Sequence, residues 1–274
     1  MTTPKHLLDQ LGIVPKKSLG QNFLQDPNTL DRIVASAQLT PDMTVLEIGA
    51  GTGALTIRLA KAARRVIAVE IDQRLEPALL ETLADAPNVE ITFADILEVD
   101  VAALVGAGQP FVVVANVPYY ITSAILRHLL ESSHRPRRLV MTVQREVADR
   151  LIAKPGDMSL LAVSIQFYGQ VRIVGKLSAA VFYPRPDVDS AVIRLDVYET
   201  PRYAVPDEAT FFKVARAGFG QRRKQLKNAI AEGLHMSHAD AEGLITRAGI
   251  DPMRRAETLT LDEWAALART IGGL

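Results

Sequence analysis

The sequence predicts an α/β fold, a mostly parallel sheet with helices on both faces, followed by a small all-α domain. Between residues 43 and 143, short apolar runs alternate with amphipathic stretches. Strands that alternate with helices imply crossover connections and therefore a parallel sheet. The run at residues 111–114 is apolar throughout, as expected for a strand covered by helices on both faces. Beyond residue 201, all the patterns are helical.

The first region contains the elements of this sheet in regular order. In the helix expected at residues 121–130, apolar residues recur at every fourth position and so share one side. Two later runs, residues 171–177 and 191–198, are expected to complete the sheet with one antiparallel edge. The remaining strands are expected at residues 45–48, 66–69, 89–93, 111–114 and 139–143, and the remaining helices at residues 54–63 and 75–83.

A linker at residues 200–206 contains two prolines and predicts a domain boundary near Pro201. Residues 1–200 are expected to form the first domain, with residues 1–40 as its N-terminal segment, and residues 201–274 the second. The helices expected in the second domain are at residues 211–217, 226–234, 239–248 and 261–271.

Composition excludes several classes of protein. The 274 residues are 48% hydrophobic, which supports a large core and excludes disorder for most of the chain. The absence of cysteine excludes disulfides, thiolate nucleophiles and Cys-ligated metals, and the five histidines show no metal-binding spacing. No metal is therefore expected. The N-terminus has no apolar signal region, and no run reaches the roughly 20 apolar residues of a membrane helix, so we expect a cytoplasmic protein. No long exposed apolar helix is expected, which favours a monomer.

Positive charge is concentrated although the net charge is zero. Residues 213–227 carry six Lys and Arg and no acid, and smaller clusters lie at residues 134–138 and at Lys16 and Lys17. Such clusters bind phosphates in a salt-dependent way, but each is also compatible with a solvated helix face. Together they favour a polyanionic partner.

A glycine-rich loop separates the first strand from the first helix. Residues 47–53 read Glu-Ile-Gly-Ala-Gly-Thr-Gly, and glycines of this kind let the backbone approach a ligand closely. The loop alone also fits a nicotinamide enzyme. Glu70 ends the second strand, where it could accept both hydroxyls of a ribose, and Asp95 ends the third, where it could accept an adenine amino group.

The fourth strand ends in Asn116-Val-Pro-Tyr119 at the same edge of the sheet. An adenine amino nitrogen is a poor nucleophile because its lone pair is delocalised into the ring. The Asn116 oxygen and a backbone carbonyl near Pro118 could hold its two hydrogens and stabilise the charge that develops on attack. Tyr119 could stack on the base, a contact worth about 1–3 kcal/mol.

These motifs resemble the ribosomal RNA adenine N6-dimethyltransferase family, with its bacterial small-subunit branch as the best match. The resemblance extends over nearly the whole chain. Besides the glycine loop, Glu70, Asp95 and Asn116-Val-Pro-Tyr119, three segments carry it. They are Lys-Ser-Leu-Gly-Gln-Asn-Phe-Leu at residues 17–24, Phe-Tyr-Pro-Arg-Pro-Asp-Val-Asp-Ser at residues 182–190, and Gln-Arg-Arg-Lys-Gln-Leu-Lys-Asn at residues 221–228 with Arg-Ala-Glu at residues 255–257.

The resemblance implies a Rossmann-like class I methyltransferase that uses S-adenosylmethionine and releases S-adenosylhomocysteine. It implies dimethylation of two adjacent adenines in the 3′-terminal hairpin loop of 16S rRNA in the 30S subunit. The implied catalytic residues are Asn116, Pro118, Tyr119 and Phe182. The implied cofactor-binding residues are Gln21, Asn22, Leu24, Gly49, Gly51, Glu70, Ile71, Asp95, Ile96 and Asn116. The implied RNA-binding residues are Lys17, Arg222, Arg223, Lys224 and Lys227.

Three alternatives differ in class. A large-subunit adenine methyltransferase of the macrolide-resistance type shares the catalytic motif but not the segments at residues 221–228 and 255–257. A nicotinamide oxidoreductase shares the glycine loop but gives Asn116-Val-Pro-Tyr119 no role. An assembly factor whose methylation is incidental remains compatible with every motif.

Overall fold

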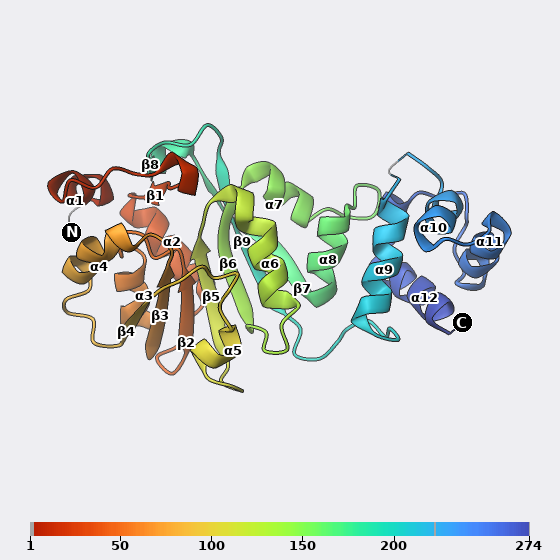
Figure 1. The fold of residues 1–274 in the computed structure, drawn as a ribbon, viewed down its shortest axis with the longest axis horizontal. Helices are drawn as coiled ribbons and strands as arrows, with labels where there is room; N and C mark the ends of the chain where they lie inside the picture. Colours follow the sequence, from red (N-terminus) through yellow and green to blue (C-terminus); the bar gives the residue numbers. More distant parts are fainter. Residues whose placement is uncertain (1–2, 222, 274) are drawn as a thin grey trace. The chain divides into compact units, whose positions relative to one another are not determined.

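A seven-stranded sheet forms the centre of the first of two units in the chain (Figure 1). The computed structural model describes residues 3–221 and 223–273. Unit 1 comprises residues 1–148 and 171–197, and unit 2 comprises residues 149–170 and 198–274. The chain therefore passes between the units inside α7 (Arg145–Leu151), inside β7 (Gly169–Leu177) and after β9 (Ser190–Val197).

The sheet is parallel except where β9 joins it. Its strand order is β4-β3-β2-β5-β6-β9-β7, and β9 pairs antiparallel with β6. The two late strands thus complete the sheet as predicted, but the antiparallel strand β9 lies between β6 and β7 rather than at the edge. The remaining strands are β2 (Thr44–Ile48), β3 (Arg65–Glu70), β4 (Val89–Phe93), β5 (Phe111–Asn116) and β6 (Arg138–Gln144). A separate antiparallel pair joins β1 (Phe23–Leu24) to β8 (Phe182–Tyr183).

The register of the parallel strands brings their carboxyl ends to one edge. Ile48 of β2 lies beside Val69 of β3 and Ala115 of β5, and Glu70 lies beside Phe93 of β4. Loops that leave these strands therefore meet at a single edge, where open α/β sheets bind ligands.

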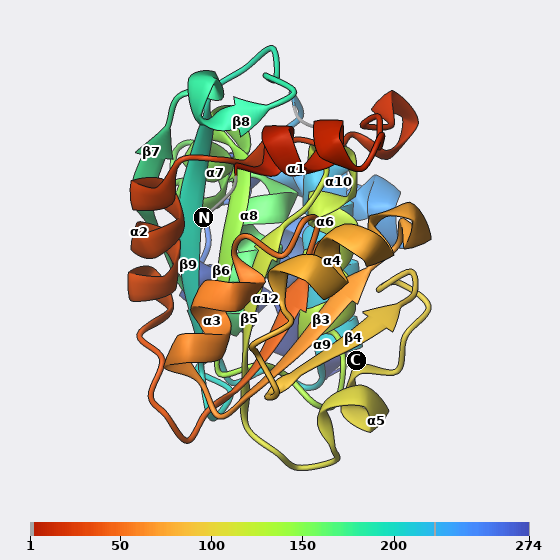
Figure 2. The same ribbon diagram turned by 90° about the vertical axis from the view of Figure 1, so that its left-hand side faces the viewer.

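Helices cover both faces of the sheet, as the apolar runs require. Figure 2 shows α2 and α3 on the near side and α6 on the far side. Leu30 and Ile33 of α2 and Leu59 of α3 join one core cluster with the strands. The helices of unit 1 are α1 (Pro4–Gln10), α2 (Pro27–Ala37), α3 (Thr56–Ala62), α4 (Glu76–Thr82), α5 (Val101–Val105) and α6 (Thr122–Leu130), followed by the start of α7.

The start of α2 shows how local sequence sets a helix boundary. The Asp26 carboxylate caps the helix by accepting the Thr29 N–H at 2.8 Å, and Pro27 occupies the first turn. This helix is not among those predicted from the sequence.

Unit 2 is helical, with α8 (Leu160–Tyr168), α9 (Glu208–Phe219), α10 (Leu226–Leu234), α11 (His238–Arg247) and α12 (Leu261–Gly272). Trp264 of α12 is fully buried and stacks on Phe219 of α9. Phe167 of α8 stacks on Phe211 of α9 with ring centroids 4.3 Å apart.

That aromatic packing explains one difference from the sequence analysis. The chain does leave unit 1 after residue 197, close to the boundary expected near Pro201, but residues 149–170 also belong to unit 2. Residues 149–170 had been assigned to the first domain. None of the helices in the described ranges is long and apolar enough to cross a membrane.

Candidate functional site

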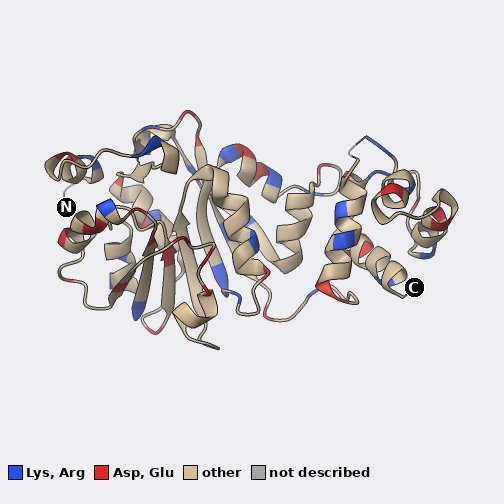
Figure 3. Cartoon of the chain, in the orientation of Figure 1, with Lys and Arg blue, Asp and Glu red and all other residues tan. Residues whose placement is uncertain are grey.

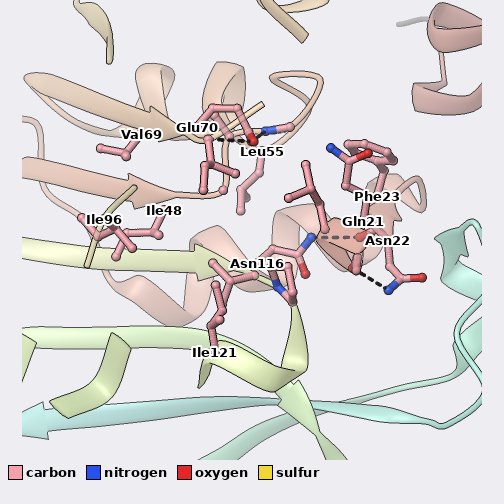
Figure 4. A pocket seen from close by; sticks show the side chains of 18 of the residues that line it. Gln21, Asn22, Phe23, Ile48, Leu55, Val69, Glu70, Ile96, Asn116 and Ile121 are labelled. Atoms are coloured by element: carbon pink, nitrogen blue, oxygen red, sulfur yellow. Dashed lines mark hydrogen bonds between the residues drawn. The ribbon is translucent and has the colours of Figure 1, made fainter. Parts of the chain in front are cut away.

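One pocket in unit 1 gathers the residues that the sequence analysis singled out as catalytic or cofactor-binding. It lies at the carboxyl ends of β2, β3 and β5, and the segment before β1 forms one of its walls. Figure 4 shows Glu70 and Asn116 at the ends of β3 and β5, on either side of β2, with Gln21, Asn22 and Phe23 opposite them. The predicted residues that line it are Gln21, Asn22, Leu24, Gly49, Gly51, Glu70, Ile71, Asp95, Ile96, Asn116, Pro118, Tyr119 and Phe182.

Two glycines of the loop have a positive φ and lie close to a neighbouring residue. Gly49 has φ +80°, and a Cβ there would lie 2.7 Å from the carbonyl oxygen of Asn116. Gly51 has φ +60°, and a Cβ there would lie 3.1 Å from the ring of Phe23. The loop therefore passes tightly between the end of β5 and the N-terminal segment, a path that a larger residue would obstruct.

Glu70 is held by backbone donors in a buried position. Its Oε2 accepts the Gly51 N–H at 2.8 Å, and its Oε1 accepts the N–H groups of Ile71 at 2.9 Å and Asp72 at 3.0 Å. A carboxylate can accept about four hydrogen bonds, so one position remains for a ligand hydroxyl. Burial raises the pKa of Glu70, and the three backbone hydrogen bonds oppose that rise.

Asp95 presents part of its carboxylate to the pocket. Its Oδ1 accepts the Leu97 N–H at 2.9 Å, and among the described residues Oδ2 has no hydrogen-bond partner. The neighbouring Ile96 is buried, whereas Ile71 is 52% exposed at the pocket wall. A carboxylate oxygen beside two apolar side chains suits a flat heteroaromatic ligand that carries an amino group.

The orientation of the Asn116 amide follows from its partner. Its nitrogen, Nδ2, donates to the Asn22 carbonyl at 3.3 Å. A carbonyl can only accept, so the atom that faces it must be the amide nitrogen rather than the oxygen. The amide oxygen of Asn116 is thereby left available for a donor from a ligand.

A buried hydroxyl fixes Tyr119. The Tyr119 hydroxyl lies 2.6 Å from the Ser190 hydroxyl, at the start of β9. Burial raises the pKa of the Tyr119 phenol, and the hydrogen bond with Ser190 opposes the rise. Phe182, also buried, lines the same pocket and pairs with Leu24 across β1 and β8. Ser190 ends the motif at residues 182–190, and its bond to Tyr119 is not predicted from the sequence.

Glu47, under the glycine loop, is a further group that sequence reasoning did not single out. It is fully buried on β2, and neither carboxyl oxygen has a hydrogen-bond partner in the described structure. Burial raises its pKa to about 8, repulsion from Glu70 adds to the rise, and the nearby Thr56 hydroxyl opposes it. An acid with a raised pKa can mark a binding site. Glu47, however, does not line the pocket, so we assign it to the support of the glycine loop that follows it.

The predicted RNA-binding residues that the structure describes lie outside the pocket. Lys17 is exposed on the N-terminal segment of unit 1, and Arg223, Lys224 and Lys227 belong to unit 2. Arg222 lies outside the described residues. Figure 3 shows acidic residues on the same helices as the basic ones. Lys224 forms an ion pair with Glu232, and Lys227 forms one with Glu242 at 2.9 Å.

Metal ligands do not gather anywhere in residues 3–221 or 223–273: the described His, Asp and Glu form no group of three that could hold an ion.

Comparison with known proteins places these features in a family. The model of the ribosomal RNA adenine dimethylase family matches residues 14–271. The chain is 44% identical over 273 residues to the ribosomal RNA small subunit methyltransferase A of Dehalococcoides mccartyi strain CBDB1, covering 100% of this chain and 94% of that protein. It is 46% identical over 275 residues to the protein of the same name from Moorella thermoacetica, covering 97% of this chain and 95% of that protein.

Solved structures agree on the fold. The structure of the 23S rRNA methyltransferase ErmE aligns with a TM-score of 0.71 at 30% identity, covering 91% of this chain and 99% of that chain. A dimethyladenosine transferase from Plasmodium falciparum aligns with a TM-score of 0.76 at 24% identity, covering 89% of this chain and 95% of that chain. The fold is thus that of the class I S-adenosylmethionine-dependent methyltransferases, and the chain belongs to the ribosomal RNA adenine dimethylase family.

Proposed function

We propose that this enzyme transfers methyl groups from S-adenosylmethionine to the N6 amino groups of two adjacent adenines. We place these adenines in the 3′-terminal hairpin loop of 16S rRNA in the small subunit, which makes the enzyme cytoplasmic. The observation that carries the proposal is the amide of Asn116, whose oxygen is left available for a ligand in the pocket.

The pocket suits the adenosine part of S-adenosylmethionine in the chemistry of its donors and acceptors. Glu70 retains one acceptor position for a ribose hydroxyl, and Asp95 has an oxygen for the adenine amino group. Ile71 and Ile96 offer apolar contact to the base, and Gly49 and Gly51 leave space that a Cβ would fill. Gln21, Asn22 and Leu24 would complete the site.

S-adenosylmethionine supplies an electrophilic methyl group on a sulfonium. Asn116 accepts one hydrogen of the target amino group, and a backbone carbonyl near Pro118 accepts the other. These two acceptors stabilise the positive charge that develops on the nitrogen, so no strong general base is required. The proton is lost to solvent once the nitrogen has become acidic.

Tyr119 and Phe182 form the aromatic walls for the target base. The hydrogen bond to Ser190 holds the Tyr119 ring in a fixed orientation, which favours stacking over free rotation. Taking a base out of its stack costs a few kcal/mol, and this cost is lower in a loop than in a duplex. The same walls must admit a monomethylated amine for the second transfer.

The basic residues of both units provide the contacts to phosphate. Lys17 would act near the pocket, while Arg223, Lys224 and Lys227 would act in unit 2. Arg222 is included on its sequence position alone. The small-subunit relatives favour a small-subunit substrate over a large-subunit one.

A methyl-transfer assay tests the proposal. The protein is incubated with labelled S-adenosylmethionine and either small or large subunits that lack adenine dimethylation. Label in small subunits alone is the expected result. Label in large-subunit RNA alone would assign the enzyme to the macrolide-resistance branch. Binding to immature small subunits without any methyl transfer would favour an assembly factor.

A further inference from the structure

The segment between α1 and β1 forms one wall of the pocket but has few apolar anchors of its own. Residues 19–22, at its end, line the pocket. Leu8 and Phe23, which flank the segment, pack together with Leu75, and Ile13 packs against them. Val14, inside the segment, is 73% exposed. Something other than apolar burial must therefore hold residues 14–21 in place.

A ring of hydrogen bonds encloses this segment. Asp72, just after β3, accepts the Gln21 amide at 2.8 Å and the Arg74 Nε at 2.9 Å. Arg74 Nη1 donates to the Val14 carbonyl at 3.2 Å. The oxygen of the Gln21 amide accepts the Lys16 N–H at 2.7 Å, which closes the ring.

We propose that Asp72 is a positioning residue that holds residues 14–22 closed over the cofactor pocket and, through Asn22, orients the Asn116 amide for methyl transfer. This role rests on the function proposed above for the same pocket.

Asp72 suits this role because it joins two parts of the site. Its side chain holds the N-terminal segment, while its backbone N–H donates to Glu70, the acid proposed to bind the ribose. The residue is 5% exposed, whereas the side chain of Arg74, its ion-pair partner, is 39% exposed. Hydrogen bonds from the Arg74 side chain, and secondly from Gln21, lower the pKa of Asp72 and keep it anionic.

The connection continues from the segment to the reacting centre. Gln21 is followed by Asn22, whose carbonyl accepts the Asn116 amide nitrogen and whose own side chain donates to the Gly20 carbonyl at 3.0 Å. Release of Gln21 from Asp72 would free this carbonyl to move. The Asn116 amide could then rotate and lose the orientation that presents its oxygen to the target amine.

The test is Asp72→Asn, which keeps the size of the side chain and removes its charge. Tryptic cleavage after Lys16 and Lys17 is followed by mass spectrometry in the protein without added ligand, alongside a thermal melt. We expect cleavage to be about tenfold faster than in the wild type because an exposed segment with weakened anchors opens more often. Methyl transfer should show a lower kcat and a higher KM for S-adenosylmethionine.

The matched control is Glu90→Gln. It removes an ion pair in which Arg65 donates twice to Glu90 at 2.7 Å, at the opposite end of β3. Its cleavage after Lys16 and Lys17 and its kinetic constants should equal those of the wild type. If Asp72→Asn does not fold, Arg74→Gln removes the bond to Val14 and the ion pair with Asp72 but keeps the bond between Asp72 and Gln21. The expected increase in cleavage is then about threefold.

Two results would overturn the positioning role. One is wild-type cleavage after Lys16 and Lys17 in both Asp72→Asn and Arg74→Gln. The other is faster cleavage with kcat and KM unchanged, which would make the ring a structural feature without influence on Asn116. Because cleavage is measured without substrate, it is informative even if the wild type fails to methylate small subunits, a failure that would count against the proposed function alone.

Discussion

The pocket of unit 1 and the basic segment of unit 2 hold their polar side chains in opposite ways. Glu70, at the pocket, is 6% exposed and accepts three backbone N–H groups. Lys224 and Lys227, in unit 2, have side chains that are 43% and 24% exposed, and each pairs with one acid. Buried directional bonds fix a side chain, whereas exposed ion pairs contribute little and weaken with salt.

This difference predicts how each region responds to substitution. A pocket residue is held in one orientation, and few other side chains can take its place. A single substitution there should therefore have a large effect on binding or catalysis. The charges of the basic segment act on a partner through their summed electrostatic field. Single substitutions there should therefore have small effects on binding affinity, and these effects should add.

Asn116→Ala should lower the rate of methyl transfer by about 10²–10³-fold, since it removes the acceptor that stabilises charge on the attacking nitrogen. Single-turnover transfer with labelled cofactor measures the effect. Affinity for S-adenosylmethionine, measured by calorimetry, should change little. Equal transfer rates in the variant and the wild type would remove Asn116 from the reaction.

Gly49→Ala should weaken cofactor binding by about 10–100-fold. Its Cβ would lie 2.7 Å from the Asn116 carbonyl oxygen, and φ +80° is unfavourable for alanine, so the loop must shift. Calorimetric titration with S-adenosylmethionine measures the loss. The matched control is Gly108→Ala, where φ is +76° but nothing lies within 4 Å of an added Cβ. Equal affinities in the two variants would contradict the role given to the close approach at Gly49.

Glu47→Gln should change the pH dependence of stability. Because the folded pKa of Glu47 is raised to about 8 from 4.5, the folded state retains a proton that the unfolded state releases. Its contribution therefore falls as the pH rises from 4.5 to 8, by about 4–5 kcal/mol over the whole range. Urea unfolding at pH 5.5 and pH 8 should show a smaller loss in Glu47→Gln than in the wild type. Exposed Glu98→Gln serves as the control, and an unchanged loss in Glu47→Gln would contradict the prediction.

Replacing Arg223, Lys224 and Lys227 together by Ala should weaken binding to small subunits a few-fold near 150 mM salt. The slope of log affinity against log salt should become shallower by about 2 because fewer counterions are released. Filter binding across a salt series provides the measurement. Lys61→Ala with Arg64→Ala, before the start of β3, is the control in unit 1. The same slope in all three proteins would exclude the segment from the RNA interface.

The sequence predicted the sheet well because its strands are continuous apolar runs, as at residues 111–114. It missed α8 because that helix is apolar on most sides, with Val163, Ile165 and Phe167 all buried, and so shows no amphipathic stripe. The aromatic packing of Phe167 on Phe211, which joins α8 to the helices of unit 2, depends on residues far apart in the chain.

The same limit applies to the candidate site. The glycines, the acids and Asn116 lie at or just after the ends of parallel strands, so strand order alone brings them to one edge. The contacts that hold them do not follow from local sequence. Tyr119 meets Ser190, Gln21 meets Asp72, and Lys224 meets an acid outside the basic run, each through the fold. Sequence could identify the groups at the site, but their partners required the structure.

The most direct test of the central claim is the identity of the methylated nucleoside. Small subunits that lack the modification are incubated with the wild-type protein and S-adenosylmethionine, and their digested RNA is analysed by mass spectrometry. The account predicts N6,N6-dimethyladenosine at two neighbouring positions near the 3′ end of 16S rRNA. A methyl group on any other atom, or on a base other than adenine, would contradict the role assigned to Asn116 and its pocket.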